Sequence, residues 1–487
     1  KINSIENFGD QYKFDKSEYG FGAINLSSGE IIALHNEDQL FNSASLVKII
    51  TTYIGLKELG PDFRWQSEFY YTGEIDGNTL KGNIIFKGRG DASFSVENLE
   101  AMIRAIQNKG IKIIEGDLIF DSSYFGLTAN GSFFDNEPMR AYNVLPNAIS
   151  IQSNTINFKF ENKNGEVTIE ADPSIKSLNI NNNINATMDS CHNWLEDLRY
   201  ETKITNLNFS GKLSQKCGAK EIDLAMLDSQ YYFYQIFKQK WIENGGWFDG
   251  DYKVISDTSA EKNRKLLASH YSDPLSSLIR DTNKYSLNLM ARNLMLTIVA
   301  EKYLIQPREE MVNSYINNWL LTHGLDADGL FIDNGAGLSR NIKVSVKQFL
   351  MILKYIYYDP MMPEMISSFP IAGIDGTLKK RMRSSSMKMN GHFKTGSMNN
   401  VSAIAGFFLN KDKVSPLYFP GEQETQASQL SLLFQPRCGL PVSPNAPTVP
   451  AGQNWHVVGG SAGGGGGAQL PQSVQSVPGE HPHGSSQ

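Results

Sequence analysis

Two residues able to do chemistry together stand three positions apart in NSASLVKIITTYIGL (42–56), namely Ser45 and Lys48. At positions i and i+3 of a helix, their side chains share one face and come within reach of each other. A serine hydroxyl becomes a nucleophile when a base takes its proton, and a lysine whose pKa is lowered by burial can act as that base. The spacing therefore suggests a serine nucleophile activated by a lysine.

The helix around this pair is apolar on almost its whole circumference, which is typical of a buried helix. A buried ammonium group is costly unless it is paired or neutralised, so Lys48 needs an explanation there. Ser45 at the helix N-terminus would also have the positive end of the helix dipole beside it. The alternative is that Lys48 snorkels from a helix edge. The SxxK spacing recurs at Ser259–Lys262 and Ser385–Lys388, both in polar segments.

Two further short motifs follow downstream. Lys394-Thr395-Gly396 lies in a strand-like segment, where lysine and threonine can bind a carboxylate while glycine lets the backbone approach a substrate. Its alternative is an exposed hairpin lysine. Ser286-Leu287-Asn288 matches SxN, a motif that is nonspecific alone because it recurs at 177–179, 397–399 and 443–445.

The composition limits the classes of protein. The 487 residues are 40% hydrophobic and 20% charged with a net charge of -6, as in a globular protein with no sign of polyanion binding. No apolar run is long enough to span a membrane. The chain opens KINSIENFGD, which we interpret as the start of a mature or trimmed chain. The sequence lacks CxxC and HExxH motifs, which argues against a zinc site and a metallopeptidase, and we expect no metal. Its one GxSxG match, at 459–463, lies in a glycine-rich segment and not in a strand-to-helix elbow, which argues against an α/β-hydrolase.

Elements that would position the motifs follow from periodicity. Residues 19–26 and 30–36 predict a hairpin. From 65 to 258 the sequence consists mainly of short strand-like runs, interrupted by one predicted helix that begins at Ser95 as its N-cap and ends at Gly110. Helical periodicity returns at 273–304 and 345–359, and 392–410 predicts two strands around a turn. We therefore expect one α/β domain, formed by 1–62 and 262–413, interrupted by a β-rich insert at 63–261.

Residues 414–487 differ in composition. They are nearly a third glycine and proline and contain no lysine, so we expect a low-complexity, disordered tail.

The order SxxK, SxN, KTG resembles penicillin-binding proteins and serine β-lactamases. The longer words are similar to the class C low-molecular-mass D-alanyl-D-alanine carboxypeptidases/endopeptidases over roughly residues 15–410. These words are FNSASLVK (41–48), GRGDASFSVENL (88–99), EGDLIFDSSYF (115–125), NKYSLNLMARNL (283–294), DNGAGLSR (333–340), FPIAGIDGTLKKR (369–381) and FKTGSMNNVSAIAGFF (393–408). The resemblance implies a β-lactamase/DD-peptidase-like domain, with an antiparallel sheet flanked by helices and a large insert.

The resemblance also implies roles. Ser45 would be acylated with Lys48 as its base, and Ser286 would pass a proton to the departing D-alanine. Asn288 would bond the peptide amide, while Lys394 and Thr395 of the KTG motif, which ends at Gly396, would anchor the terminal carboxylate. The backbone N–H groups of Ser45 and Ser397 would form the oxyanion hole. No cofactor is implied. The expected partners are peptidoglycan stem peptides and β-lactams, in the periplasm.

Two features bear on this resemblance. Some relatives carry a CxxW…C pair similar to Cys191 and Cys217, which implies a disulfide, although two separate thiols remain the alternative. After Lys413 the tail replaces the family's last strand and helix, which we interpret as a frameshift, a read-through or an assembly error. The alternatives to an active peptidase are a β-lactamase or esterase of the same fold and a catalytically impaired peptidoglycan-binding protein.

Overall fold

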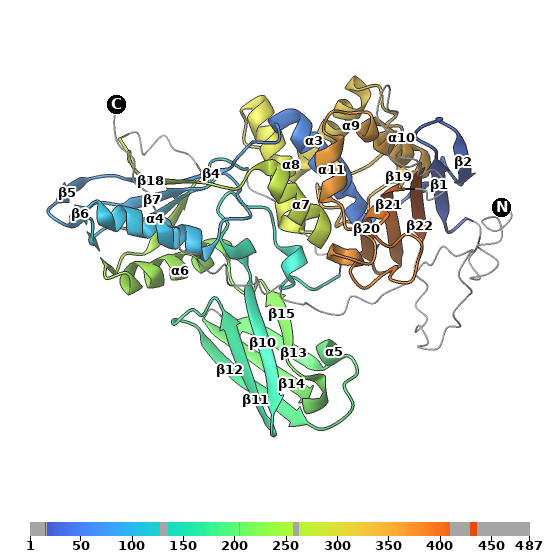
Figure 1. Cartoon of the computed structure of the whole chain (residues 1–487). Helices are drawn as coiled ribbons and strands as arrows, with labels where there is room; N and C mark the ends of the chain where they lie inside the picture. The colour runs from blue at the N-terminus through green and yellow to red at the C-terminus, as the bar shows by residue number, and fades with distance from the viewer. Residues whose placement is uncertain are drawn as a thin grey trace, which may run out of the picture.

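The computed structural model describes residues 15, 17–126, 135–203, 205–256, 263–409 and 429–435, the last range as backbone only. These residues form three lobes (Figure 1), of which one combines a sheet with most of the helices. Two large hydrophobic clusters fill them, one in the helical lobe and one shared by the other two. The chain thus has a mixed α and β fold in which an insert with its own core interrupts the first lobe.

A five-stranded antiparallel sheet forms one side of the helical lobe, in the order β2-β1-β22-β21-β20. The predicted hairpin is present as β1 and β2, and the two strands predicted for 392–410 are β20 and β21. Their bounds are β1 (Gly20–Ile24), β2 (Ile31–His35), β20 (Gly391–Met398), β21 (Val401–Phe408) and β22 (Gln429–Gln435).

Six helices pack beside this sheet in the described part of the lobe. The predicted buried helix is α3, whose first ten residues are all buried. The helices are α3 (Val47–Leu59), α7 (Leu275–Tyr285), α8 (Asn288–Tyr303), α9 (Val312–Thr322), α10 (Val346–Tyr357) and α11 (Met362–Ser368). A small pairing of β3 (Leu40–Phe41) with β19 (Val344–Ser345) ties the segment before α3 to the start of α10.

The tail contributes a strand, which corrects one expectation. Residues 429–435 form β22, which pairs antiparallel with β1 on one side and with β21 on the other. The prediction that the tail leaves the sheet without its last strand is therefore wrong. The prediction relied on the average composition of more than seventy residues. That average does not reveal QLSLLFQ, a short apolar run of strand length. The remainder of 410–487 lies outside the described residues.

The second lobe combines two sheets with two helices. A five-stranded sheet has the order β17-β9-β7-β4-β18, and a four-stranded sheet has the order β16-β8-β6-β5. The strands are β4 (Gln66–Tyr71), β5 (Glu74–Asp76), β6 (Thr79–Lys81), β7 (Ile84–Lys87), β8 (Ile113–Ile114), β9 (Leu118–Asp121), β16 (Trp247–Phe248), β17 (Tyr252–Ile255) and β18 (Lys265–Tyr271). The helices are α4 (Val96–Asn108), which Ser95 caps as predicted, and α6 (Ser229–Glu243).

β18 moves one domain boundary. This strand pairs antiparallel with β4 and so completes the sheet of the insert. The insert therefore extends to about Tyr271 rather than ending at 261, and the helical lobe resumes with α7. The polar sequence around 261 predicts a boundary there, whereas the next strand, KLLASHY, pairs with a strand of the insert.

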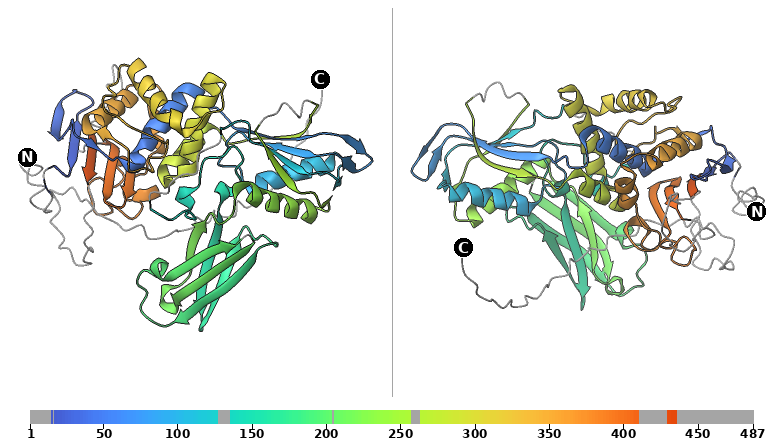
Figure 2. Two further views of the ribbon diagram at one scale, coloured as in Figure 1. Left: turned by 180° about the vertical axis from the view of Figure 1, so that it is seen from behind. Right: turned by 45° about the horizontal axis from the view of Figure 1, so that its top comes forward.

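The third lobe is a small β structure that projects from the other two in both views of Figure 2. One sheet has the order β11-β10-β15 and the other β12-β14-β13. The elements are β10 (Ile156–Lys163), β11 (Glu166–Asp172), β12 (Asn179–Thr187), α5 (Trp194–Asp197), β13 (Leu198–Lys203), β14 (Asn206–Ser214) and β15 (Lys220–Leu224).

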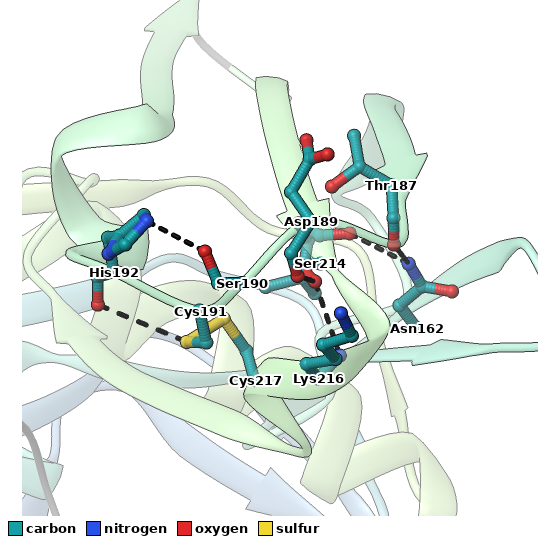
Figure 3. Close-up of a disulfide and its surroundings, with 10 residues drawn as sticks. Asn162, Thr187, Asp189, Ser190, Cys191, His192, Ser214, Lys216 and Cys217 are labelled. Atoms are coloured by element: carbon teal, nitrogen blue, oxygen red, sulfur yellow. Dashed lines mark hydrogen bonds between the residues drawn. A yellow bond between two sulfur atoms is a disulfide. The ribbon is translucent and has the colours of Figure 1, made fainter.

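A disulfide closes this lobe (Figure 3). It joins Cys191 to Cys217, 26 positions apart, which is the pairing that the resemblance implied. Beside it, the Ser214 hydroxyl donates to the carbonyl of Asp189, and the Asn162 amide donates to the carbonyl of Leu213 at 2.7 Å. The disulfide thus links the loop after β12 to the end of β14.

Candidate active site

The site is built around the turn that precedes α3. Ser45 lies in a short 3-10 helix, Ala44–Leu46, which runs directly into α3. Ala44 has a positive φ of 46°, and its N–H donates to Asn42 Oδ1 at 2.9 Å. Asn42 also donates from Nδ2 to the carbonyl of Ser339 at 2.8 Å. These bonds fix the turn and leave Ser45 half-buried at the start of a buried helix.

Lys48 lies one turn further along α3, where the i, i+3 spacing placed it. Its Nζ lies 3.0 Å from Ser45 Oγ, 2.6 Å from Asn288 Oδ1 and 2.6 Å from the carbonyl oxygen of Ala336. The side chain is 0% exposed, so Lys48 does not snorkel to the surface. It has no carboxylate among these partners.

This environment disfavours the charged form of Lys48. Burial holds the pKa of Lys48 well below its usual range, and the positive charges of Lys394 and Arg292 act in the same direction. A neutral lysine amine has two N–H donors and one lone pair. Its two short contacts are to oxygens that can only accept, Asn288 Oδ1 and the Ala336 carbonyl. The lone pair is then left for the proton of the Ser45 hydroxyl.

A second lysine–serine pair faces the same site. Ser286 occupies the left-handed turn between α7 and α8, with φ of 62°. Lys394, on β20, donates to Ser286 Oγ at 2.9 Å and to the carbonyl of Thr395 at 2.8 Å. Lys394 is 0% exposed, and burial lowers its pKa to about 7. The three motifs recognised in the sequence therefore converge, although 108 positions separate Ser286 from Lys394.

Asn288 connects the SxN motif to Lys48. It begins α8, accepts from Lys48 through Oδ1, and donates from Nδ2 to the carbonyl of Tyr142 at 2.9 Å. An asparagine side chain has capacity for four hydrogen bonds. Asn288 therefore holds Lys48 in place and keeps one lone pair and one N–H for a further partner.

β20 passes directly against the nucleophile turn. A Cβ on Gly396 would lie 2.4 Å from the carbonyl oxygen of Ser43 and 3.1 Å from the Ser45 nitrogen, so only glycine allows this approach. The next residue, Ser397, has an exposed side chain. The backbone of β20 therefore reaches the place where an acceptor bound to Ser45 would lie.

The sequence did not reveal several groups that hold the site. The carbonyls of Ala336 and Tyr142 accept from Lys48 and Asn288, and the Gly335 carbonyl accepts from Thr51 Oγ1 at 2.7 Å. Every residue has a carbonyl, so no residue type could signal these contacts. The only indication in the sequence was the family-like segment DNGAGLSR (333–340), which contains Gly335 and Ala336. Because Ala336 acts through its backbone, its side chain has no part in these contacts.

The described residues hold no group of three or more His, Cys, Asp or Glu side chains that could bind a metal ion. The site instead offers a serine beside a buried lysine with a lowered pKa, a second serine with a lysine, and a glycine-containing strand. These groups suit acyl transfer through a serine ester.

Comparison with known proteins agrees with this chemistry. The family model described as the D-Ala-D-Ala carboxypeptidase 3 (S13) family matches residues 2–419. The chain belongs to this family. It is therefore a serine-type D-Ala-D-Ala carboxypeptidase of the low-molecular-mass penicillin-binding class, as the sequence motifs predicted.

Curated relatives extend over most of the chain. A D-alanyl-D-alanine carboxypeptidase, DacB, of Haemophilus influenzae is 27% identical over 406 residues, which cover 81% of this chain and 83% of the relative. The D-alanyl-D-alanine carboxypeptidase of an Actinomadura species is 23% identical and covers 80% of this chain and 74% of its own. The penicillin-sensitive carboxypeptidase A of Dictyostelium discoideum is 26% identical, with 81% and 80% covered.

A solved structure establishes the fold. Penicillin-binding protein 4 of Haemophilus influenzae matches with a TM-score of 0.75 at 23% identity, covering 92% of this chain and 96% of that protein. The expected DD-peptidase-like domain with its large insert is confirmed. A structure of that same protein in complex with a β-lactam matches with a TM-score of 0.70 at 24% identity, over 89% of this chain and 93% of that one.

Proposed function

We propose that Ser45 and Lys48 carry out a two-step acyl transfer on peptidoglycan stem peptides ending in D-Ala-D-Ala. Ser45 Oγ attacks the carbonyl of the penultimate D-alanine while Lys48 takes the hydroxyl proton. The peptide C–N bond then breaks, and Ser286 passes a proton to the departing D-alanine nitrogen. Water finally attacks the ester, returns a proton to Ser45, and releases the shortened peptide as a carboxylate.

The observation that carries this proposal is the set of contacts around Lys48. Two carbonyl-type oxygens at 2.6 Å occupy its two N–H donors, and Ser45 Oγ lies 3.0 Å away on the remaining side. A lysine in this position is a general base already aligned with its nucleophile.

Binding of the substrate is assigned to the neighbouring motifs. Lys394 and Thr395 anchor the terminal carboxylate, because a buried lysine gains a strong charge-assisted bond when an anion arrives. The N–H groups of Ser45 and Ser397 bind the oxyanion, each worth on the order of 3 kcal/mol in such sites. The free hydrogen-bonding capacity of Asn288 serves the peptide amide.

The location follows from the substrate, and we assign it to the periplasm. Peptidoglycan lies outside the cytoplasm, and the Cys191–Cys217 disulfide fits an oxidising compartment. Within the described residues, the helices are too short or too polar to cross a bilayer.

Labelling by a fluorescent penicillin tests the proposal, because a β-lactam acylates the same serine. The parent chain should be labelled, and Ser45→Ala should lose the label. Ser385→Ala is the matched control, since Ser385–Lys388 has the same spacing away from the site, and it should keep the label. The parent should also release D-alanine from an acylated Lys-D-Ala-D-Ala peptide.

Other results would redirect the proposal. A parent chain that takes no label would contradict the enzyme and support the impaired, wall-binding alternative. Rapid hydrolysis of a chromogenic cephalosporin, in place of a stable adduct, would favour the β-lactamase alternative. Conversion of crosslinked dimers into monomers, measured beside release of D-alanine from monomeric stem peptides, separates endopeptidase from carboxypeptidase activity.

A further inference from the structure

A loop outside the three motifs reaches into the site at the KTG strand. Thr377 lies in a short 3-10 helix, Gly376–Leu378, and its Oγ1 is 2.8 Å from Oγ1 of Thr395. Thr395 is buried, and Thr377 is half-buried. Two hydroxyls at this distance share one hydrogen bond in which either can be the donor, so the donor's proton points at the other oxygen.

The loop is held to the SxN turn by a half-buried ion pair. Lys284, two positions before Ser286, is 4% exposed and donates to Asp375 Oδ2 at 2.5 Å and to the carbonyl of Phe369 at 3.1 Å. The other oxygen of Asp375 accepts from the Ile371 N–H at 2.7 Å. Both ends of the loop are therefore tied to the element that carries Ser286.

Gly376 lets the loop approach closely. It has φ of 53°, and a Cβ there would lie 2.5 Å from the carbonyl oxygen of Lys284. A side chain would push the loop away from α7 and with it Thr377 from Thr395. The ion pair, this glycine and the hydroxyl pair are three separate observations, and they all determine where Thr377 lies.

We infer that Thr377 is a positioning residue for the carboxylate anchor of the site. It donates its hydroxyl proton to Thr395 Oγ1, so the Thr395 proton is free to donate to the terminal carboxylate of the substrate. A threonine hydroxyl has one proton only. When no neighbouring hydroxyl donates to Thr395 Oγ1, the Thr395 hydroxyl can donate its proton to an acceptor other than the substrate. This inference rests on the proposed function, because it specifies how that function selects peptides with a free C-terminus.

The test compares an acylated Lys-D-Ala-D-Ala peptide with its C-terminal amide. Thr377→Val keeps the shape and removes the hydroxyl, and it should raise KM for the carboxylate peptide about tenfold with kcat within about twofold. Its kcat/KM for the amide should stay within about twofold. Thr377→Ser restores the hydroxyl and should restore KM. Gly376→Ala keeps the hydroxyl but displaces the loop, so it should resemble Thr377→Val.

The outcomes separate this inference from the proposed function. The inference is overturned, while the function stands, if Thr377→Val keeps the wild-type preference for the carboxylate peptide. It is also overturned if Thr377→Val lowers kcat/KM equally for both peptides and Thr377→Ser does not restore it. If the parent releases no D-alanine and takes no penicillin label, both are overturned together. Selective loss for the carboxylate peptide, rescued by serine, supports the inference.

Discussion

Lys48 and Asn288 lie 240 positions apart in the sequence, yet Nζ of the lysine is 2.6 Å from Oδ1 of the asparagine. The contact joins α3, which follows the turn of Ser45, to the first residue of α8. A neutral amide is significant at this point, because it accepts from Lys48 without stabilising a positive charge as a carboxylate would. The asparagine thus orients the Lys48 amine and leaves its pKa low.

Asn288→Asp is expected to inactivate the enzyme because it introduces a negative charge, since the two side chains have nearly the same shape. A carboxylate at this position favours the protonated form of Lys48 and raises its pKa, so less neutral base is present at pH 7. We expect acylation by penicillin to slow about 100-fold at pH 7, with the acid limb of the pH–rate profile moved to higher pH. Stopped-flow labelling from pH 5 to 10 measures this shift. A uniform loss at every pH would show that the asparagine acts in some other way.

The part of the site predictable from sequence is the local part. Ser45 and Lys48 are neighbours because a helix places i and i+3 on one face, and the apolar residues around them indicated burial. The meeting of Lys394 with Ser286 is different. No spacing rule connects residues 108 positions apart, and only the order of the motifs in a known family implied it. Thr377 stood in a recognised word, FPIAGIDGTLKKR, but nothing in its type showed that it faces Thr395.

In the fold, too, elements set by local patterns are predictable and those set by long-range pairing are not. The hairpin β1–β2, the capped helix α4 and the strands β20 and β21 follow from short-range patterns. Sequence patterns do not reveal β22, because one of its partners, β1, lies more than 400 positions before it and because the glycine and proline around it dominate the composition. β18 was assigned to the wrong domain for a related reason, since its partner β4 lies near residue 70.

The buried Lys394 should cost stability in a pH-dependent manner. Its pKa is lowered to about 7 in the fold, against about 10.5 in an unfolded chain. Between these values the unfolded state binds the extra proton, so the free energy of unfolding rises with pH through this window, and below pH 7 the full penalty applies. Lys394→Met should therefore be inactive but more stable by about 2 kcal/mol at pH 6, after allowing for its two lost hydrogen bonds.

Thermal unfolding of the parent and Lys394→Met at pH 6 and pH 9 checks this expectation. The gain in Tm should be larger at pH 6 and should shrink at pH 9. Lys388→Met, at an exposed lysine, serves as the control and should show no such trend. A gain that is the same at both values of pH would mean that desolvation of the charge is not its cause.

The disulfide should stabilise the small β lobe without affecting catalysis. Replacing Cys191 and Cys217 together by serine removes a crosslink across 26 positions, which costs about 3 kcal/mol in the chain-entropy model. The lobe projects away from the helices and sheet that hold Ser45 (Figure 1), so penicillin labelling at 25 °C should be unchanged. Calorimetry measures the stability, and alkylation without reductant should modify one cysteine of the parent, Cys438. Modification of three would show that the bond is absent.

Leu432→Pro tests whether β22 completes the catalytic sheet. Leu432 stands opposite Gly22 of β1 and Ala405 of β21, so it lies on an interior strand with a neighbour on each side. Proline removes an N–H from the ladder and does not fit an interior strand, which should cost about 3 kcal/mol or more. Because β21 pairs with β20, which carries Lys394, the loss should also reduce penicillin labelling. Leu432→Val keeps the N–H and a branched apolar side chain, and it should retain both stability and labelling. Equal melting temperatures for the two variants would mean that 429–435 does not form the strand, and the five-stranded sheet would then lack its central member.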